Sequence, residues 1–270
     1  MDLSDFKVFL MEKERSSETI ESYLWTVNTY FKTYGEINKL SLLEFKNKLI
    51  NENSPATAAQ RCFAMNAYCE FIGKPELKLK GVRVHNTTGV ENVITEEEYK
   101  HFLNCLLKDG NIKTYWLLRY LAGTGARVSE ILKMKKSDLD IGMCTIWTKG
   151  KIRTIYIPKT LIDESREYFN STEGELLFPN RYGKPMGRTG VHRQIEKYGL
   201  RYGIRKEVLH PHAFRHFFAI EFLKQNNNLT LLSSLLGHES VTTTSIYLRQ
   251  STKQQMEELN KAYEKFAQNI

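Results

Sequence analysis

His212-Ala213-Phe214-Arg215-His216 is the most informative stretch of this chain, and Leu236-Gly237-His238 and Tyr247 follow it. An arginine, three histidines and a tyrosine therefore recur at short, fixed distances. A guanidinium group offers a planar, permanently charged fork for two phosphate oxygens, and a phenol is a nucleophile. The combination indicates a site that holds a phosphate diester and attacks it without a thiol, a metal or a nucleotide.

His212 and Arg215 are three positions apart on a helix predicted over 212–223, so both side chains should point to one face. For this pair alone, a surface arginine beside a core histidine is the more common arrangement. His212 and His216 also have the spacing of a zinc helix, but Ala213 replaces the glutamate of the H-E-x-x-H motif. Arg215 would also repel a dication, and we expect no metal site.

His238 and Tyr247 are nine positions apart, which would place them on opposite faces of a continuous helix. If both serve one site, the chain must break between them. Gly237 can end the helix predicted over 229–236, and Ser240 can cap the next one. We therefore predict a broken helix with His238 before the break and Tyr247 after it.

Two further basic candidates, Arg127 and Lys149, lie upstream of this cluster. Arg127 follows Gly123-Thr124-Gly125-Ala126, which resembles the start of a dinucleotide-binding fingerprint. The third glycine is missing, no β-α-β unit surrounds the segment, and no Walker sequence is present. Phosphate handling would then rest on arginine, lysine and histidine, and we expect no cofactor.

The apolar pattern predicts a mainly α protein with a small β-sheet, built from two domains. Residues 1–80 should form a small helical bundle, with helix caps at Ser17, Ser41 and Ser54. From 81 to 92 the periodicity stops, which indicates a linker.

Residues 93–270 should form the second domain, which opens with a capping box at Thr95 and Glu98. Two strand-like runs over 143–148 and 153–157 indicate a hairpin. Helices are predicted over 115–122, 189–198, 212–223 and 229–236, from Thr242 onward, and as an amphipathic C-terminal helix over 253–266.

Composition favours a cytoplasmic protein that does not contact a membrane. No apolar run approaches the ~18 residues of a membrane span, and the acidic N-terminus lacks a signal-peptide pattern. Four cysteines without a C-x-x-C pair indicate reduced structural thiols.

The net charge of +8 is unevenly distributed. Residues 1–80 carry 11 basic and 11 acidic side chains, whereas residues 93–270 carry 27 and 19. The local peak spans 181–206, and such a stretch suits a polyanion, although a solvated basic face has the same composition.

Four segments in order resemble the signature of tyrosine recombinases of the phage-integrase class. Thr124–Ile131 resembles the motif of the first catalytic arginine, and Lys149–Arg153 the β-hairpin with the catalytic lysine. Pro211–His216 resembles the H-x-x-R motif, and Leu235–Ser240 with Thr244 and Tyr247 resembles the final histidine and the nucleophile. The N-terminal helices resemble the core-binding domain of the family, so the resemblance covers nearly the whole chain.

The chain departs from the family pattern at three points. The hairpin is about one residue shorter than the common K-G-x-K-x-R form, so Lys149 is favoured as the catalytic lysine while Lys151 stays open. Leu248-Arg249 replaces the frequent Thr-His, and because the chain begins with the predicted core-binding helices, we expect no arm-binding domain. This favours a simple, Xer-like or mobile-element integrase.

The resemblance implies a site-specific DNA recombinase or integrase that works through a 3′-phosphotyrosine on Tyr247, without ATP or metal. Arg127 and Arg215 would hold the phosphate, Lys149 would be the general acid, and His212 and His238 would bind the phosphate or move the tyrosine proton. Glu130 and His216 would orient these groups. The DNA-binding residues would be Lys151, Arg153, Arg181, Lys184, Arg188, Arg193, Lys197 and Arg201.

The expected partner is double-stranded DNA, bound by a homotetramer or heterotetramer on synapsed duplexes, with a monomer in solution left open. The N-terminal bundle would close over the duplex as a clamp. Three alternatives stay open: a type IB-like topoisomerase, a catalytically decayed DNA-binding accessory factor, and a helical protein-interaction module. Relaxation of supercoils without site dependence would favour the first, and adduct formation would exclude the second.

Overall fold

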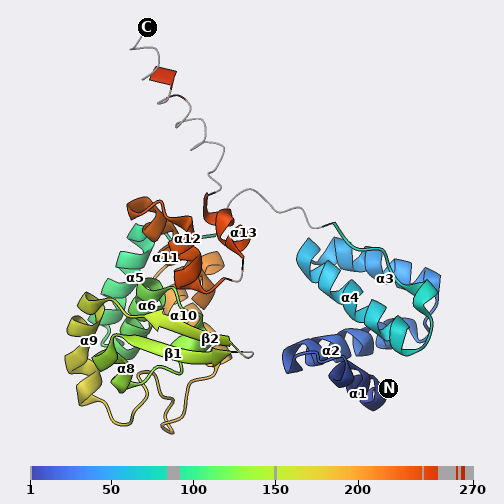
Figure 1. Cartoon of the computed structure of the whole chain (residues 1–270), viewed down its shortest axis with the longest axis horizontal. Coiled ribbons are helices and arrows are strands. Elements are labelled where there is room, and N and C mark those ends of the chain that lie inside the picture. The colour runs from blue at the N-terminus through green and yellow to red at the C-terminus, as the bar shows by residue number, and fades with distance from the viewer. Residues whose placement is uncertain are drawn as a thin grey trace. The chain divides into compact units, whose positions relative to one another are not determined.

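The computed structural model describes residues 2–83, 92–148, 151–238, 240–248, 260, 263 and 264, without the side chains of Thr148 and Lys151. The chain divides into two compact units, Met1–Thr87 and Thr88–Ile270 (Figure 1), each with an apolar core of its own. Residues 84–91 of the predicted linker lie outside the described residues. The same holds for the predicted C-terminal helix over 253–266, except for residues 260, 263 and 264, which are helical.

The smaller unit is helical throughout its described part (Figure 1). Its elements are α1 (Ser4–Glu12), α2 (Ser17–Tyr34), α3 (Lys39–Glu52), α4 (Pro55–Phe71) and the 3-10 helix η1 (Pro75–Leu77). Aromatic side chains fill much of the core; the rings of Phe6 and Tyr68, for example, meet edge to face with centroids 5.1 Å apart. Cys62 and Cys69 are buried here as free thiols.

Two of the predicted helix caps in this unit are wrong. Ser16 rather than Ser17 caps α2, because its side chain accepts a hydrogen bond from the Thr19 amide. Asn38 caps α3, and Ser41 is the third helical residue, whose hydroxyl accepts from the Asn38 amide at 3.2 Å. A serine at that position takes the place of the usual glutamate in a capping box. The prediction of Ser54 as the cap of α4, followed by proline, is confirmed.

The larger unit is mainly helical, with one hairpin. Its helices are α5 (Glu96–Lys108), α6 (Ile112–Thr124), α7 (Val128–Ile131), α8 (Lys136–Ile141), α9 (Lys159–Ser171), α10 (Arg188–Arg201), α11 (Pro211–Gln225), α12 (Leu229–Leu236) and α13 (Val241–Thr244), with 3-10 helices η2 (Lys206–Val208) and η3 (Ser245–Leu248). The capping box of Thr95 and Glu98 at the start of α5 is confirmed. Helices α6 and α11 pack against each other in the apolar core.

Helix α9 was not predicted. Its buried stripe consists of Leu161, Ile162, Ser165 and Phe169, so only three strongly apolar residues mark thirteen positions. The stripe still covers the core, because these residues recur at helical spacing on one face.

Strands β1 (Met143–Thr148) and β2 (Lys151–Tyr156) pair antiparallel, with Ile146 opposite Arg153 and Cys144 opposite Ile155. Strand β2 begins two residues earlier than predicted and ends one earlier. Cys144, Ile146 and Ile155 are buried, so the alternation of a strand places Arg153 on the inner face with them. No helix in the described residues has the length and apolar character needed to cross a bilayer.

Candidate active site

Arg215 on α11 connects the segments that carry the predicted site residues. Its side chain is buried, at 1% exposure, and its Nη1 donates to the Gly125 carbonyl at 2.7 Å. Its Nη2 donates to the Leu236 carbonyl at 2.7 Å and lies 2.9 Å from His238 Nε2. One guanidinium therefore joins the loop before Arg127 to the C-terminal end of α12.

The Nε of Arg215 is a buried donor without a hydrogen-bond partner among the described residues. Desolvation, followed by the charges of Arg127 and Arg153, lowers the pKa of Arg215 to about 10, so it stays cationic at neutral pH. Leaving a buried donor unpaired is unfavourable. A bound anion would satisfy this donor, and the arrangement fits a phosphate.

The hydrogen bonds of His238 define its tautomer. Because an arginine can only donate, Nε2 of His238 accepts from Arg215. Nδ1 then carries the proton and donates to Thr244 Oγ1 at 2.8 Å. Desolvation and the charges of Arg215 and Arg127 lower the pKa of His238 to about 4, so the ring is neutral. The sequence did not identify Thr244 as the partner of His238.

The predicted break between His238 and Tyr247 is confirmed. Helix α12 ends at Gly237, which has a left-handed φ of 60°, and the Ser240 side chain caps α13 by accepting from the Thr242 amide. Tyr247 lies in η3, directly after the four-residue α13. The two short elements turn the chain back, so that Tyr247 packs beside α11 and α12.

Tyr247 is held by His216, with 2.8 Å between its hydroxyl and Nδ1. Burial raises the pKa of the Tyr247 phenol, and the charge of Arg215 partly opposes this. Burial, followed by the neighbouring His212, lowers the pKa of His216 to about 3. The phenol is therefore protonated and can donate to a neutral imidazole. The family resemblance implies only an orienting role for His216, although its spacing of four from His212 indicates a shared helical face.

The rings of His212 and His216 meet edge to face, with centroids 4.3 Å apart and an interplanar angle of 72°. His212 is exposed, yet desolvation by the surrounding protein, followed by the charge of Arg215, lowers its pKa. His210, which sequence reasoning did not single out, caps α11 through Nδ1, which accepts from the Ala213 amide at 3.1 Å. The described residues contain no group of three or more His, Cys, Asp or Glu arranged as metal ligands.

Glu130 fixes Arg127 at the start of α7. The carboxylate is buried, and it accepts from the Arg127 amide at 2.7 Å and from Arg127 Nη1 at 3.1 Å. The Arg127 side chain stays 46% exposed. Its charge contributes to the lowered pKa values of Arg215, His212 and His238.

The candidate acids Lys149 and Lys151 follow β1 in the sequence. Lys149 is outside the described residues, as is the side chain of Lys151.

The structure does not support the prediction that Arg153 contacts DNA, because its side chain is turned into the protein. Its side chain is 10% exposed, and its Nε lies 3.0 Å from Glu130 Oε1. Its two Nη atoms donate to the carbonyls of Leu235 and Leu236. A side chain held in this way does not reach a DNA backbone.

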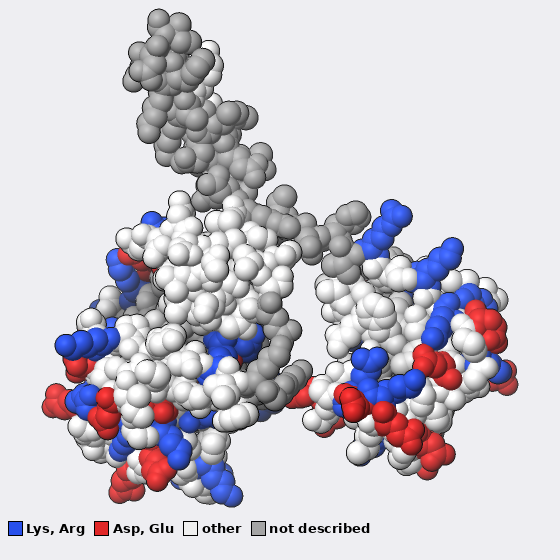
Figure 2. Space-filling view, viewed as in Figure 1, with Lys and Arg blue, Asp and Glu red and all other residues white. Residues whose placement is uncertain are grey.

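The remaining basic candidates lie at the surface. Arg201 pairs with Asp109 at 3.1 Å. On α10, Val191 and Ile195 are buried, while Arg193 and Lys197, one turn apart, are exposed. The other exposed candidates are Arg181, Lys184 and Arg188. Figure 2 also shows Lys or Arg side chains inside a hollow in the larger unit.

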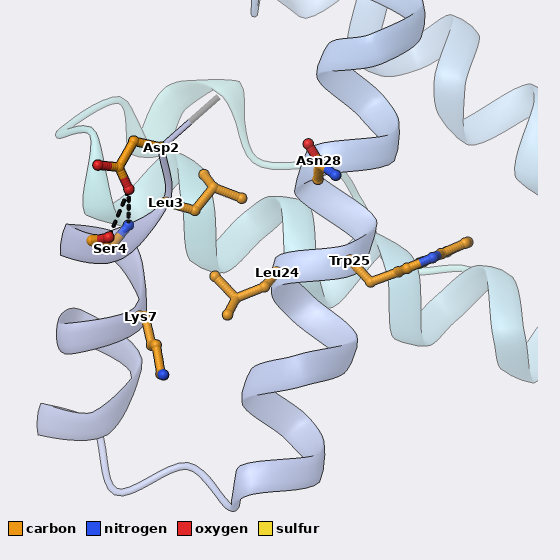
Figure 3. Close-up of a pocket in the computed structure, with 7 residues that line it drawn as sticks. All are labelled: Asp2, Leu3, Ser4, Lys7, Leu24, Trp25 and Asn28. Atoms are coloured by element: carbon orange, nitrogen blue, oxygen red, sulfur yellow. Dashed lines mark hydrogen bonds between the residues drawn. The ribbon is translucent and has the colours of Figure 1, made fainter.

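The smaller unit has a cavity of about 370 Å³ between α1 and α2 (Figure 3). Leu24, Trp25 and Asn28 line one side, and the start of α1 lines the other. Asp2 there accepts from both the amide and the hydroxyl of Ser4, at 2.9 and 2.6 Å, and so holds the start of the helix. None of the residues predicted to act on a phosphate lines this cavity.

The lowered pKa values of His216 and His238 predict a loss of stability in acid. The folded chain keeps both rings neutral down to about 3 and about 4, whereas an unfolded histidine binds a proton near 6.5. Below pH 6.5 the unfolded state therefore holds more protons, and the free energy of unfolding falls as pH falls towards 4. Each histidine lowers the free energy of unfolding by at most about 1.4 kcal/mol for each pH unit in this range. Urea denaturation at pH 7, 6 and 5 measures the decline, and His216→Phe should reduce its slope. A stability that is flat over this range would contradict the assignment.

Gly237→Ala should destabilise the larger unit more than a left-handed backbone alone explains. A Cβ at Gly237 would collide with Arg153 Nη1, and that guanidinium is also held by the ion pair of its Nε with Glu130. The matched control is Gly203→Ala, where φ is also positive, at 74°, but nothing lies within 4 Å. We expect a loss of about 1 kcal/mol for Gly203→Ala and of about 3 kcal/mol or more for Gly237→Ala in denaturant titrations. Equal losses would mean that Arg153 moves aside freely.

Comparison with known proteins gives concordant results. The sequence profile described as the phage integrase family matches residues 92–254. Tyrosine recombinase XerA of Thermococcus kodakarensis is 31% identical, over 97% of this chain and 94% of that protein. Tyrosine recombinase XerD of Staphylococcus haemolyticus is 27% identical, over 92% of this chain and 93% of that protein.

Solved structures show the same fold. The crystal structure of XerA recombinase aligns with a TM-score of 0.55 and 23% identity, over 96% of this chain and 97% of that one. XerH site-specific recombinase, bound to its difH substrate before cleavage, gives a TM-score of 0.69 and 23% identity over 91% and 79%. A lambda integrase dimer bound to a COC′ core site aligns with a TM-score of 0.71 and 19% identity, over 91% of this chain and 93% of that one.

Proposed function

Because the chain belongs to the phage integrase family and is a tyrosine-type site-specific recombinase, we propose that it cleaves and rejoins DNA through a 3′-phosphotyrosine on Tyr247. The observation that carries the proposal is the contact of Tyr247 with His216, one residue after the buried Arg215. A phenol on η3 thus contacts a neutral proton acceptor on α11, and the residue before that acceptor is the cationic Arg215.

The phosphate would bind between Arg215 and Arg127. The unpartnered Nε of Arg215 and the exposed guanidinium of Arg127 supply donors for the non-bridging oxygens. Fixed donors of this kind stabilise the charge that develops on a pentacovalent phosphorus without reorganising during the reaction. His212 and His238 would add hydrogen bonds, since phosphate binding favours their protonated forms.

In the cleavage step, Tyr247 Oη forms a bond to phosphorus while the bond from phosphorus to the 5′-oxygen breaks. The phenol proton passes to His216 Nδ1, to which it is already hydrogen-bonded. The departing 5′-oxygen takes a proton from Lys149, with Lys151 as the other candidate. Because the phosphotyrosine conserves the ester, a 5′-hydroxyl from another strand reverses the step without ATP or metal.

Double-stranded DNA would be the substrate, held by exposed basic residues of the larger unit. We assign this contact to Arg181, Lys184, Arg188, Arg193 and Lys197, with Lys151 at the hairpin. Residues 1–80 would act as a clamp on the duplex, joined through residues 81–92 to the catalytic domain. A lambda integrase tetramer has been crystallised on a Holliday junction, which supports a tetrameric synapse for this chain as well.

The test is covalent trapping on nicked duplexes that together cover the replicon carrying the gene. Loss of the short strand beyond a nick prevents religation, so a cleaving enzyme accumulates as a DNA adduct that survives SDS. We expect adducts at one or a few sites, with protein on the 3′-phosphate. Binding without any adduct would indicate an accessory factor, and relaxation of supercoiled DNA without site dependence would indicate a topoisomerase.

A further inference from the structure

The buried Arg153 on β2 contacts two separate parts of the site. Its Nε forms an ion pair with Glu130 Oε1 at 3.0 Å, without the geometry of a hydrogen bond, and its Nη2 donates to the Leu235 carbonyl at 3.3 Å. Its Nη1 donates to the Leu236 carbonyl. The side chain is charged and only 10% exposed, which is costly without a role. No step of the proposed reaction uses it directly.

On one side, Arg153 shares a carboxylate with Arg127. Glu130 Oε1 lies 3.0 Å from Arg153 Nε and 3.1 Å from Arg127 Nη1, and Oε2 accepts from the Arg127 amide. The position of this carboxylate therefore sets the direction of the Arg127 fork. Because Arg153 is fixed to β2, the carboxylate is fixed to the hairpin.

On the other side, Arg153 shares a carbonyl with Arg215. The Leu236 oxygen accepts from Arg153 Nη1 and also from Arg215 Nη2, the latter at 2.7 Å. This oxygen belongs to the last turn of α12, where carbonyls lack partners within the helix. His238 follows two residues later, and its Nε2 lies 2.9 Å from the same Arg215 Nη2.

We propose that Arg153 is a positioning residue that couples Arg127 to the pair of Arg215 and His238, so that the phosphate donors are set as one unit. The inference rests on the proposed DNA cleavage, but it concerns a residue outside the reacting groups. Arg153 reaches the phosphate only through Glu130 and the Leu236 carbonyl. Its loss should slow the chemical step and leave DNA binding nearly unchanged.

The experiment compares Arg153→Met and Arg153→Lys with wild type. Methionine keeps much of the volume but removes the fork, while Glu130 keeps its contacts to Arg127. Lysine keeps the charge, but a single ammonium cannot span Glu130 and two carbonyls. Arg166→Met is the matched control, since Arg166 forms an exposed ion pair with Asp140 at 2.8 Å. For each variant one measures the single-turnover rate of adduct formation, the DNA dissociation constant and Tm.

We expect Arg153→Met to slow adduct formation about 10- to 100-fold, with a dissociation constant close to that of wild type. Arg153→Lys should recover only part of the rate, and Arg166→Met should behave as wild type. In an Arg127→Lys background, the Arg153→Met defect should shrink, because the group that it positions is already altered.

A wild-type rate in Arg153→Met would overturn the proposal. So would full recovery in Arg153→Lys, or a defect of unchanged size in the Arg127→Lys background. If Arg153→Met does not fold, the test uses Arg153→Lys instead. Its rate of adduct formation, measured alone and together with Arg127→Lys, then decides whether Arg153 positions Arg127. Absence of an adduct from wild type would instead count against the proposed function, so the two failures are distinguishable.

Discussion

Tyr247→Phe should eliminate the covalent DNA adduct, with no detectable product at any enzyme concentration that saturates the duplex. The substitution removes the oxygen that, in the proposed reaction, forms the bond to phosphorus. The ring of Tyr247 packs against α11 and α12, and phenylalanine keeps that contact. Loss of the hydrogen bond to His216 should reduce stability by only about 1 kcal/mol. DNA binding should therefore stay near the wild-type level, as measured by fluorescence anisotropy.

Tyr182→Phe is the control for this experiment. Tyr182 is 70% exposed, and the substitution keeps its ring beside the Arg181 guanidinium while removing a hydroxyl. Adduct formation should continue at the wild-type rate. An adduct of normal yield in Tyr247→Phe would refute the assignment of the nucleophile, and peptide mapping of the adduct would identify the residue that replaces it.

Lys149→Ala should slow cleavage of an ordinary DNA duplex by about 10²- to 10⁴-fold, the usual contribution of a general acid. The departing 5′-alkoxide is a poor leaving group and needs a proton. When sulfur replaces the bridging 5′-oxygen, the thiolate leaves without one. On that substrate Lys149→Ala should approach the wild-type rate in single-turnover adduct assays.

Lys151→Ala serves as the comparison, because both lysines belong to the same hairpin segment. We expect a smaller defect in Lys151→Ala, of similar size on both substrates, as for a residue that contacts the DNA backbone. Sulfur rescue of Lys151→Ala without rescue of Lys149→Ala would reverse the assignment. Rescue of neither variant would mean that another group protonates the 5′-oxygen.

Local sequence signals predicted those parts of the site that depend on the chain within a few residues. The break between His238 and Tyr247 could be predicted because Gly237 adopts a left-handed conformation and Ser240 caps the next turn. The helix that carries His212 and Arg215 could be predicted from its apolar period. The caps of α2 and α3 were misassigned because two residues near each start can accept from an early amide, and sequence does not rank them.

Contacts between distant segments could not be predicted in this way. His216 and Tyr247 are 31 positions apart, and their meeting depends on how α13 and η3 fold back. The sequence places Arg153 among the predicted DNA contacts, which requires an exposed side chain. In β2 the reverse holds: Ile152 is 60% exposed, whereas Arg153 faces the core, because Glu130 and two helix-end carbonyls are there to receive it.

The shared acceptor between Arg153 and Arg215 is a main-chain oxygen, and this determines which positions can change by mutation. A carbonyl is supplied by any amino acid, so the side chain at Leu236 is free to vary as far as core packing allows. The adjacent Gly237 has no such freedom, since a single added carbon meets the guanidinium of Arg153. Two neighbouring positions are therefore limited by different requirements: variants selected for activity should keep an apolar side chain that fills the core at 236 and should keep glycine at 237.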